Sequence, residues 1–190
     1  MAAEEKRRVA FFGGSFNPPH VGHVLAVAYA LSTAPVDEVL VVPVHRHPFS
    51  KELIPFADRL AMCRLAFGWL PGAVISTVEE ELGGESLTLR TLEHLTAQHP
   101  DWSLRLLVGA DVLGDLHKWH RWDRVSALAP PLVLGRAGIE RSDAPEPMLP
   151  RVSSTEIRTA LGKGDLDALR ALVPSRVLDH IAAAGLYRGT

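Results

Sequence analysis

Apolar and polar positions along the chain form two kinds of pattern. Short, nearly continuous apolar runs predict buried strands, and longer apolar stretches with small or regularly spaced residues predict helices. The predicted strands cover residues 9–12, 38–44, 73–79, 103–108 and 131–134. The predicted helices cover residues 21–32, 56–69, 88–98, 153–161 and 174–184. Strands and helices therefore alternate through most of the chain.

This alternation indicates an α/β fold, because strands that are apolar on both faces need helices on each side. We predict a doubly wound parallel sheet in one domain that spans residues 1–190. The sheet and its flanking helices occupy residues 9–136, and C-terminal helices occupy residues 152–188. Residues 141–150 are rich in proline and predict an exposed loop. Ligands of such folds bind beyond the carboxyl ends of the strands, so the segments that follow the strands hold the candidate site.

Composition and charge restrict the class of protein. A single cysteine, Cys63, excludes an internal disulfide framework and argues against a cysteine-based zinc site. The net charge of −2 argues against broad nucleic-acid binding. No apolar stretch approaches the roughly 18 residues that span a bilayer, and the apolar run near the start is too short for a signal peptide. We therefore expect a cytoplasmic protein without nucleic-acid or membrane partners, and we leave homo-oligomerisation open.

The first candidate for chemistry is the segment 13–23, which follows the first predicted strand. Gly13 and Gly14 allow a sharp turn and a close approach of the backbone to a ligand. His20 and His23 lie three residues apart where a helix is predicted to begin, so both imidazoles can share one face. The free N–H groups of a helix start attract anions. The segment therefore suits a polyphosphate, with a histidine metal pair or a plain structural loop as alternatives.

The second candidate is the segment 152–158. A serine or threonine with Glu156 nearby is a helix-start signature, which is the purely structural interpretation. Three consecutive hydroxyls, Ser153, Ser154 and Thr155, followed one turn later by Arg158, can also surround a phosphate. The G-x-G-x-x-G pattern of dinucleotide cofactor folds is absent from the sequence.

These two segments, in this order, resemble the nucleotidyltransferases that carry the T/HxGH motif. Residues 13–23 match their G-G-[ST]-F-[DN]-P-x-H-x-G-H signature, and 152–158 resemble I-S-S-T-x-I-R with Val152 for isoleucine. The resemblance narrows to bacterial nicotinate-nucleotide adenylyltransferases. Residues 107–119 are similar to their G-x-D…K-W segment, 86–92 to S-x-T-x-x-T-L, and 58–62 to an R-x-x-M helix.

The resemblance implies a Rossmann-like fold and a reaction of ATP with nicotinate mononucleotide. The products would be nicotinate adenine dinucleotide and pyrophosphate, and the phosphate of the mononucleotide would attack the α-phosphorus of ATP directly. Catalysis would then depend on positioning two anions and stabilising charge. Mg²⁺ is implied together with ATP, held mainly by phosphates, and no metal-ligating residues are assigned.

The resemblance also implies roles for individual residues. His20, His23 and Arg158 would be catalytic, with the imidazoles donating to the α- and β-phosphates and the guanidinium holding the β- and γ-phosphates. The residues implied to bind ATP are Gly13, Gly14, Ser15, Phe16, His20, His23, Gly109, Asp111, Arg136, Ser153, Ser154, Thr155 and Arg158, those of the first loop through backbone groups. The residues implied to bind the mononucleotide are Ser15, Phe16, Lys51, Thr88 and Trp119. Trp119 would stack on the pyridine ring.

The loop after the second predicted strand departs from the family pattern. The family has Pro-His-Lys there, whereas this chain has Phe49 and Ser50 at the histidine and lysine positions. Lys51, Arg46 or His47 could supply the positive charge from a shifted position, and Lys51 is our candidate. This departure puts in doubt any phosphate contact carried over to the loop.

Several alternatives stay open on the sequence alone. Leu87 and His120 stand where many family members have aromatic residues, which leaves the shape of the pyridine pocket open. The acceptor of the adenylyl group could be nicotinamide mononucleotide or phosphopantetheine. A cytidylyltransferase is a further alternative, but such enzymes usually have a different C-terminal signature. A non-catalytic nucleotide-binding module is the alternative from another class. We expect such a module to lose His20, His23 or Arg158, and all three are present.

Overall fold

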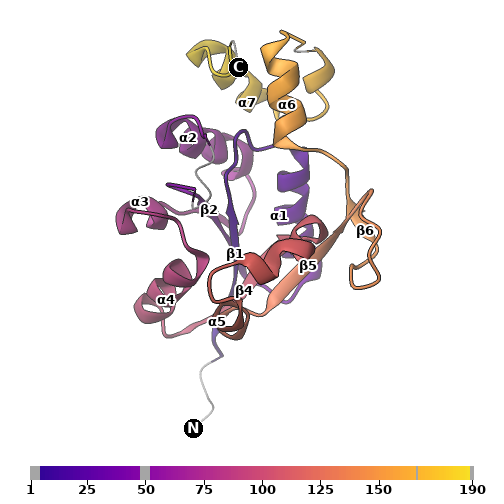
Figure 1. Ribbon diagram of the computed structural model, residues 1–190. Helices are drawn as coiled ribbons and strands as arrows, with labels where there is room; N and C mark the ends of the chain where they lie inside the picture. The colour runs from indigo at the N-terminus through magenta and orange to yellow at the C-terminus, as the bar shows by residue number, and fades with distance from the viewer. Residues whose placement is uncertain (1–4, 48–51, 166, 189–190) are drawn as a thin grey trace.

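Six parallel strands form one sheet in the computed structural model, which describes residues 5–47, 52–165 and 167–188 (Figure 1). The strands are β1 (Arg7–Gly14), β2 (Glu38–Pro43), β3 (Ala73–Ile75), β4 (Trp102–Gly109), β5 (Pro131–Arg136) and β6 (Pro147–Leu149). Their order is β3–β2–β1–β4–β5–β6, and every neighbouring pair is parallel. The chain builds outward from β1 to β3 and then crosses back to β4. The order therefore reverses between β1 and β4, which is where such folds place ligands.

Helices cover both faces of this sheet, as the apolar runs predict. They are α1 (Val21–Thr33), α2 (Phe56–Phe67), α3 (Val78–Leu82), α4 (Thr88–Gln98), α5 (Trp122–Leu128), α6 (Ser154–Gly162) and α7 (Ser175–Ala184). Successive side chains of β1 point to opposite faces. Ala10 and Phe12 pack with α1, α2, α6 and α7, whereas Val9 and Phe11 pack with α3, α4 and α5. The doubly wound α/β prediction is therefore confirmed.

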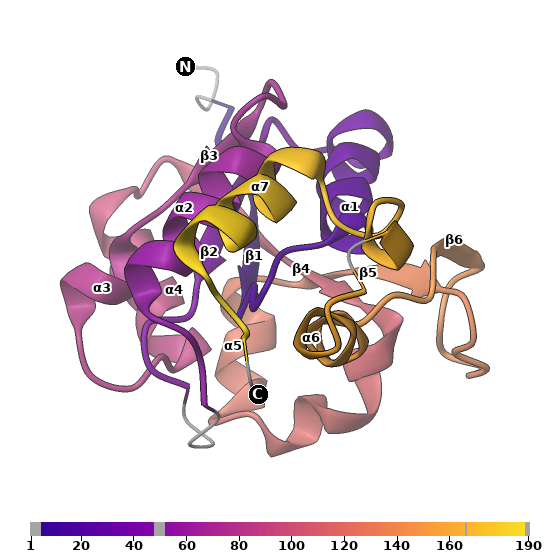
Figure 2. The same ribbon diagram turned by 90° about the horizontal axis from the view of Figure 1, so that it is seen from above.

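The C-terminal helices lie at one end of the sheet. Figure 1 shows α6 and α7 at the end of the molecule opposite to the start of β1, beyond the carboxyl ends of the strands. Figure 2 shows α7 beside α2. The segment predicted to bind phosphate at the start of α6 is therefore on the same side of the molecule as the loop that follows β1.

The predicted element types are confirmed along most of the chain, and three segments differ: 73–79, 110–128 and the end of the predicted loop 141–150. The run 73–79 is a strand only over Ala73–Ile75, because Val78 begins α3. Glu79, Glu80 and Glu81 favour a helix start, since carboxylates complement the positive end of the helix dipole. Residues 110–128, for which the pattern predicts no element, contain a 3-10 helix, η1 (Ala110–Lys118), and α5. The tighter 3-10 turn does not show the apolar spacing of an α-helix.

The predicted loop 141–150 is exposed over most of its length but ends in the edge strand β6. β6 pairs with β5 through Gly135 and Arg136. A Cβ atom at Gly135 would collide with the backbone oxygen of Glu146, so the glycine is what lets the two strands approach. A second short 3-10 turn, η2 (Asp167–Leu169), precedes α7. Among the described residues no helix is long and apolar enough to cross a membrane.

Candidate active site

The loop after β1 brings the first sequence motif to the carboxyl edge of the sheet. The Gly14 carbonyl accepts a hydrogen bond from the Val44 N–H at 2.9 Å, which ties this loop to the end of β2. Phe16 has a φ of 45°, a left-handed conformation that is rare for a bulky residue and typical of functional sites. Its side chain is only 1% exposed. Phe16 therefore belongs to the core, and only its backbone can face a ligand.

His20 and His23 are brought together as predicted. His20 immediately precedes α1, and His23 lies in the first turn of that helix. Their rings stack with centroids 3.7 Å apart. The His20 backbone N–H donates to Nδ1 of His23 at 3.1 Å. This bond leaves Nδ1 without a proton, so the neutral ring carries its proton on Nε2, where it can be donated to a ligand.

Burial keeps both imidazoles neutral. Burial, together with the positive charge of Arg136, lowers the pKa of His20 to about 3. The pKa of His23 also lies well below its usual value, first because the ring is buried and then because His20 and Arg136 are close. Near neutral pH these residues are therefore hydrogen-bond donors without net charge.

The second motif meets the first across a long separation in sequence. Arg158 in α6 donates from Nη1 to the Asn17 carbonyl at 2.8 Å and from Nη2 to Oγ1 of Thr155 at 3.3 Å. The Ser154 hydroxyl donates to the Pro18 carbonyl at 2.9 Å. The two segments predicted to bind phosphate are therefore in direct contact.

The hydroxyls of this second motif already have structural roles. Oγ of Ser153 accepts a hydrogen bond from the Glu156 N–H at 3.2 Å, which makes Ser153 the N-cap of α6. The helix-start interpretation of the motif is therefore confirmed. It is compatible with phosphate binding, because a helix N-terminus has several N–H groups without an intrahelical partner and the cap satisfies one of them.

A small cavity of about 160 Å³ lies between the histidine pair and the carboxyl end of β4. Gly22, His23, Gly109, Asp111 and Arg136 contribute to its wall. Arg136 forms an ion pair with Asp111, with Nη1 and Oδ2 2.8 Å apart. It also donates a hydrogen bond to the Val152 carbonyl next to α6. Gly109, Asp111 and Arg136, which the resemblance implies bind ATP, therefore lie together around one cavity.

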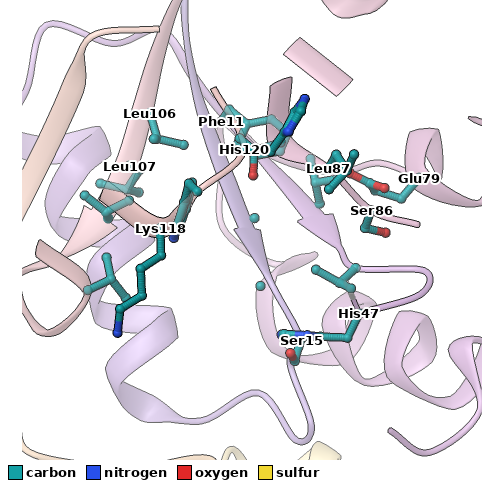
Figure 3. A pocket seen from close by; sticks show the side chains of 18 residues that line it. Phe11, Ser15, His47, Glu79, Ser86, Leu87, Leu106, Leu107, Lys118 and His120 are labelled. Atoms are coloured by element: carbon teal, nitrogen blue, oxygen red, sulfur yellow. The ribbon is translucent and has the colours of Figure 1, made fainter. Parts of the chain in front are cut away.

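A larger cavity of about 480 Å³ adjoins the small one (Figure 3). Gly13 and Trp119 line both cavities. The indole ring of Trp119 packs edge-on against Trp122, with ring centroids 6.0 Å apart. The larger cavity includes the predicted residues Gly13, Gly14, Ser15, Thr88 and Trp119. It also includes three polar residues to which our sequence analysis assigns no individual role: Glu79, Ser86 and Lys118. His47, a possible source of positive charge in the sequence analysis, and His120, a departure from the family pattern, line it as well.

The segment 86–92 contributes Ser86 and Thr88 to the wall of this cavity, and its third hydroxyl residue, Thr91, is buried behind them. Oγ of Ser86 accepts the backbone N–H groups of His45 and Arg46 at 2.9 and 3.3 Å. Thr88 itself lines the cavity. Thr91 donates from Oγ1 to Oε1 of the buried Glu79 at 2.5 Å. The hydroxyls of the S-x-T-x-x-T segment thus connect the loop after β2 and the helix α3 to the start of α4.

Arg59 is a buried residue whose role the sequence pattern does not indicate. It is 1% exposed, and its guanidinium donates to four backbone carbonyls. The acceptors are Ile54 at 3.1 Å, Ser15 at 3.0 Å, Val44 at 2.6 Å and His45 at 3.3 Å. Arg59 therefore connects the loops that follow β1 and β2. The only sequence signal for it is the R-x-x-M resemblance at 58–62.

The predicted residues therefore gather in one region with two exceptions. One group lies in or next to the loop after β1 but is not in the walls of the two cavities: Phe16, His20, Ser153, Ser154, Thr155 and Arg158. Lys51 lies outside the described residues. On the larger cavity the structure places Lys118, which pairs with Asp115 at 2.6 Å, and the imidazole rings of His47 and His120.

Comparison with known proteins agrees with this geometry. A model of the Cytidylyltransferase-like family matches residues 11–160. A probable nicotinate-nucleotide adenylyltransferase of Anaeromyxobacter sp. (strain K) is 51% identical over 186 residues, covering 96% of this chain and 98% of that protein. The chain belongs to the nicotinate-nucleotide adenylyltransferase family. A second family member, from Myxococcus xanthus (strain DK1622), is 42% identical and covers 95% of this chain and 94% of its own length.

Solved structures show the same fold. The nicotinic acid mononucleotide adenylyltransferase of Plasmodium falciparum, complexed with NaAD, aligns with a TM-score of 0.82 at 18% identity. The alignment covers 95% of this chain and 97% of that one. A putative nicotinate-nucleotide adenylyltransferase from Vibrio parahaemolyticus aligns with a TM-score of 0.71 at 23% identity. The arrangement of strands and C-terminal helices is therefore shared with distant proteins of this family.

Proposed function

We propose that this chain joins ATP and nicotinate mononucleotide to give nicotinate adenine dinucleotide and pyrophosphate. The observation that carries the proposal is the contact between the two phosphate-binding segments, made by Ser154 and Arg158 with the loop after β1. They meet where the strand order reverses, next to two adjoining cavities. The names of two relatives, 51% and 42% identical over nearly the whole chain, support the same reaction.

In this reaction a phosphate oxygen of the mononucleotide attacks the α-phosphorus of ATP, and the bond to pyrophosphate breaks. No enzyme nucleophile is needed, so the protein acts by alignment and by stabilising charge. The ring N–H groups of His20 and His23 would donate to the α- and β-phosphates, that of His23 from Nε2. Arg158 and the first turn of α6 would hold the departing pyrophosphate. Holding both reactants in line is worth roughly 7–11 kcal/mol.

We expect Mg²⁺ to accompany ATP rather than to occupy a protein cage. In the described part of the chain no group of three or more histidines, cysteines, aspartates or glutamates is placed to hold a metal ion. Asp111, the carboxylate nearest to the histidine pair in the small cavity, is paired with Arg136. Phosphate oxygens and water suit Mg²⁺, so the ion would neutralise phosphate charge while the protein orients the nucleotide.

The larger cavity is the proposed place for the mononucleotide, with Trp119 stacked on its ring and Thr88 in the wall. We also propose that the reaction takes place in the cytoplasm, where ATP is supplied. Nicotinamide mononucleotide is the second candidate acceptor, because it differs from the nicotinate compound only in an amide for a carboxylate.

Pyrophosphate release tests the proposal. We expect release with ATP and nicotinate mononucleotide, a lower kcat/KM with nicotinamide mononucleotide, and little release when CTP replaces ATP or phosphopantetheine replaces the mononucleotide. Equal or reversed kcat/KM for the two mononucleotides would remove the nicotinate preference and keep the enzyme class. ATP binding without turnover of any acceptor would instead support a non-catalytic nucleotide-binding module.

A further inference from the structure

Glu79 places a buried carboxylate on the larger cavity. It lies in the first turn of α3 and is 6% exposed. Figure 3 shows Glu79 on the same side of the cavity as Ser86 and Leu87. Its Oε1 accepts one side-chain hydrogen bond, from the Thr91 hydroxyl at 2.5 Å. Within residues 5–47, 52–165 and 167–188, Glu79 forms no ion pair.

Such a carboxylate is costly unless something compensates its charge. Glutamate is almost never this buried without a partner, because desolvation disfavours the charged form. One hydroxyl satisfies only one of its roughly four acceptor positions. The neighbouring walls include Phe11, Val42 and Leu106, and these apolar side chains lower the local dielectric and strengthen the field of the carboxylate.

The substrate proposed for this cavity carries a permanent positive charge. In an oxidised pyridine mononucleotide the ring nitrogen is bonded to the ribose, so the ring is a pyridinium cation at every pH. Trp119 adds an indole face, which attracts cations through its ring quadrupole. An aromatic face and a buried carboxylate on one cavity together suit a flat cation better than a neutral ring.

We propose that Glu79 is a specificity-determining residue that selects the positively charged pyridinium ring of the mononucleotide, with Thr91 fixing the orientation of its carboxylate. This inference rests on the proposed function and adds to it the property of the substrate that the cavity recognises. The selection concerns the ring charge, and it is separate from the choice between a carboxylate and an amide on the ring.

The test compares two substrates that differ in ring charge. Nicotinate mononucleotide has a pyridinium ring, and its 1,4-dihydro form has a neutral ring with the same ribose phosphate. Glu79→Gln keeps an oxygen for the Thr91 hydroxyl and removes only the charge. We expect it to raise KM for nicotinate mononucleotide by about 10- to 100-fold, the range for charges several ångströms apart in a partly polar medium. The kcat/KM for nicotinate mononucleotide, divided by that for its 1,4-dihydro form, should fall by a similar factor. The KM for ATP should stay within about twofold of the parent value.

Thr91→Val is the matched control, because it removes the hydroxyl and keeps the charged carboxylate. If the Glu79–Thr91 pair is only structural, both variants lower the melting temperature and neither changes the substrate ratio. That result would overturn the inference. If Glu79 selects ring charge, Thr91→Val retains most of the preference for the pyridinium form and Glu79→Gln loses it.

The outcome separates this inference from the proposed function. Turnover of nicotinate mononucleotide by the parent protein, with an unchanged substrate ratio in Glu79→Gln, rejects the role of Glu79 and keeps the adenylyltransferase. In that case the parent protein and Glu79→Gln have the same kcat/KM for the neutral-ring substrate relative to that for nicotinate mononucleotide. Absence of turnover by the parent protein with either mononucleotide would reject the proposed function itself, and the inference with it.

Discussion

At the scale of single residues, burial and one backbone hydrogen bond decide what the histidine pair can do. The His20 N–H occupies Nδ1 of His23, which leaves the Nε2–H of His23 as its donor. Because burial lowers the pKa of both rings, neither is a cation that would attract ATP strongly in the ground state. Their contribution should therefore appear mainly as charge develops on the phosphates during the reaction.

This reasoning predicts the effect of His23→Ala. We expect kcat to fall by about 10²–10³-fold, as for removal of one preorganised donor, while the dissociation constant of ATP changes far less. Single-turnover rates and ATP titrations on the same preparation measure the two effects. Melting temperature is the control, because a His23 that only packs would lower stability and leave turnover per folded molecule unchanged. A destabilised variant with normal single-turnover chemistry would remove His23 from the site.

At the scale of elements, the ends of β1 and β2 are joined by a buried cation on α2. The Arg59 guanidinium donates to carbonyls of the loops after both strands, including Ser15 and Val44. It also lies over the ring of Phe56, 5.4 Å from the centroid. Arg59 thus holds the loops after β1 and β2 next to each other at the cavity. The position of the loop after β1, which carries Gly13 and Gly14, therefore depends on α2.

We therefore expect Arg59→Met to be destabilising. Methionine fills a similar volume but leaves several buried carbonyls without donors, each at about 1–3 kcal/mol. A loss of roughly 2–5 kcal/mol in unfolding free energy should follow, together with a higher KM for both substrates. Chemical denaturation and steady-state kinetics measure these changes.

Arg64→Met is the matched control on the same helix, because Arg64 is exposed. Surface substitutions of this kind usually change stability by no more than about 0.5 kcal/mol. Equal stability of the two variants would contradict the bridging role of Arg59.

At the scale of the whole molecule, the site lies at the carboxyl edge of a sheet that has an apolar core on each face. Phe12 belongs to one core and Phe11 to the other, and both adjoin the cavities at the carboxyl end of β1. The C-terminal helices close one side by packing on α1 and α2. The histidine pair is buried within this arrangement, so its ionisation is coupled to unfolding of the molecule.

The coupling has a definite sign. The pKa of His20 is lowered to about 3 in the folded state and that of His23 well below its usual value, whereas in the unfolded chain both are near 6.5. Below that pH the unfolded state binds more protons, so stability decreases as the pH falls. We expect the unfolding free energy to drop between pH 7 and pH 4, by up to about 1.4 kcal/mol per pH unit for each histidine.

Denaturation curves at several pH values measure this drop. His23→Gln, which cannot be protonated in this range, should show a shallower dependence than the parent protein. His94→Gln is the control, because His94 lies on α4, away from the two cavities described above. An identical slope in the parent protein and in His23→Gln would contradict a buried neutral His23.

Much of this molecule could be predicted from local sequence. Periodicity and apolar runs depend on neighbouring residues, so they determine where most strands and helices lie and that helices cover both faces. The signature around His20 and His23 can also be recognised from neighbouring residues, because it consists of a strand end followed directly by a helix start. For the same reason the pattern is uninformative where the backbone follows a 3-10 path, as in η1, or where a short edge strand such as β6 is stabilised by its neighbour.

Only the tertiary structure decided which groups meet. Arg158 and Asn17 are 141 positions apart, and their hydrogen bond exists because α6 packs at the end of the sheet. Packing between distant segments also brings Arg59 to the carbonyls of Ser15 and Val44 and places Glu79 in the wall of the larger cavity. The sequence specifies which functional group each side chain carries, but the burial, pKa and partners of that group depend on packing between distant segments. The sequence thus determined the element order and the reactive residue types, and packing determined the shape and charge of the cavity they surround.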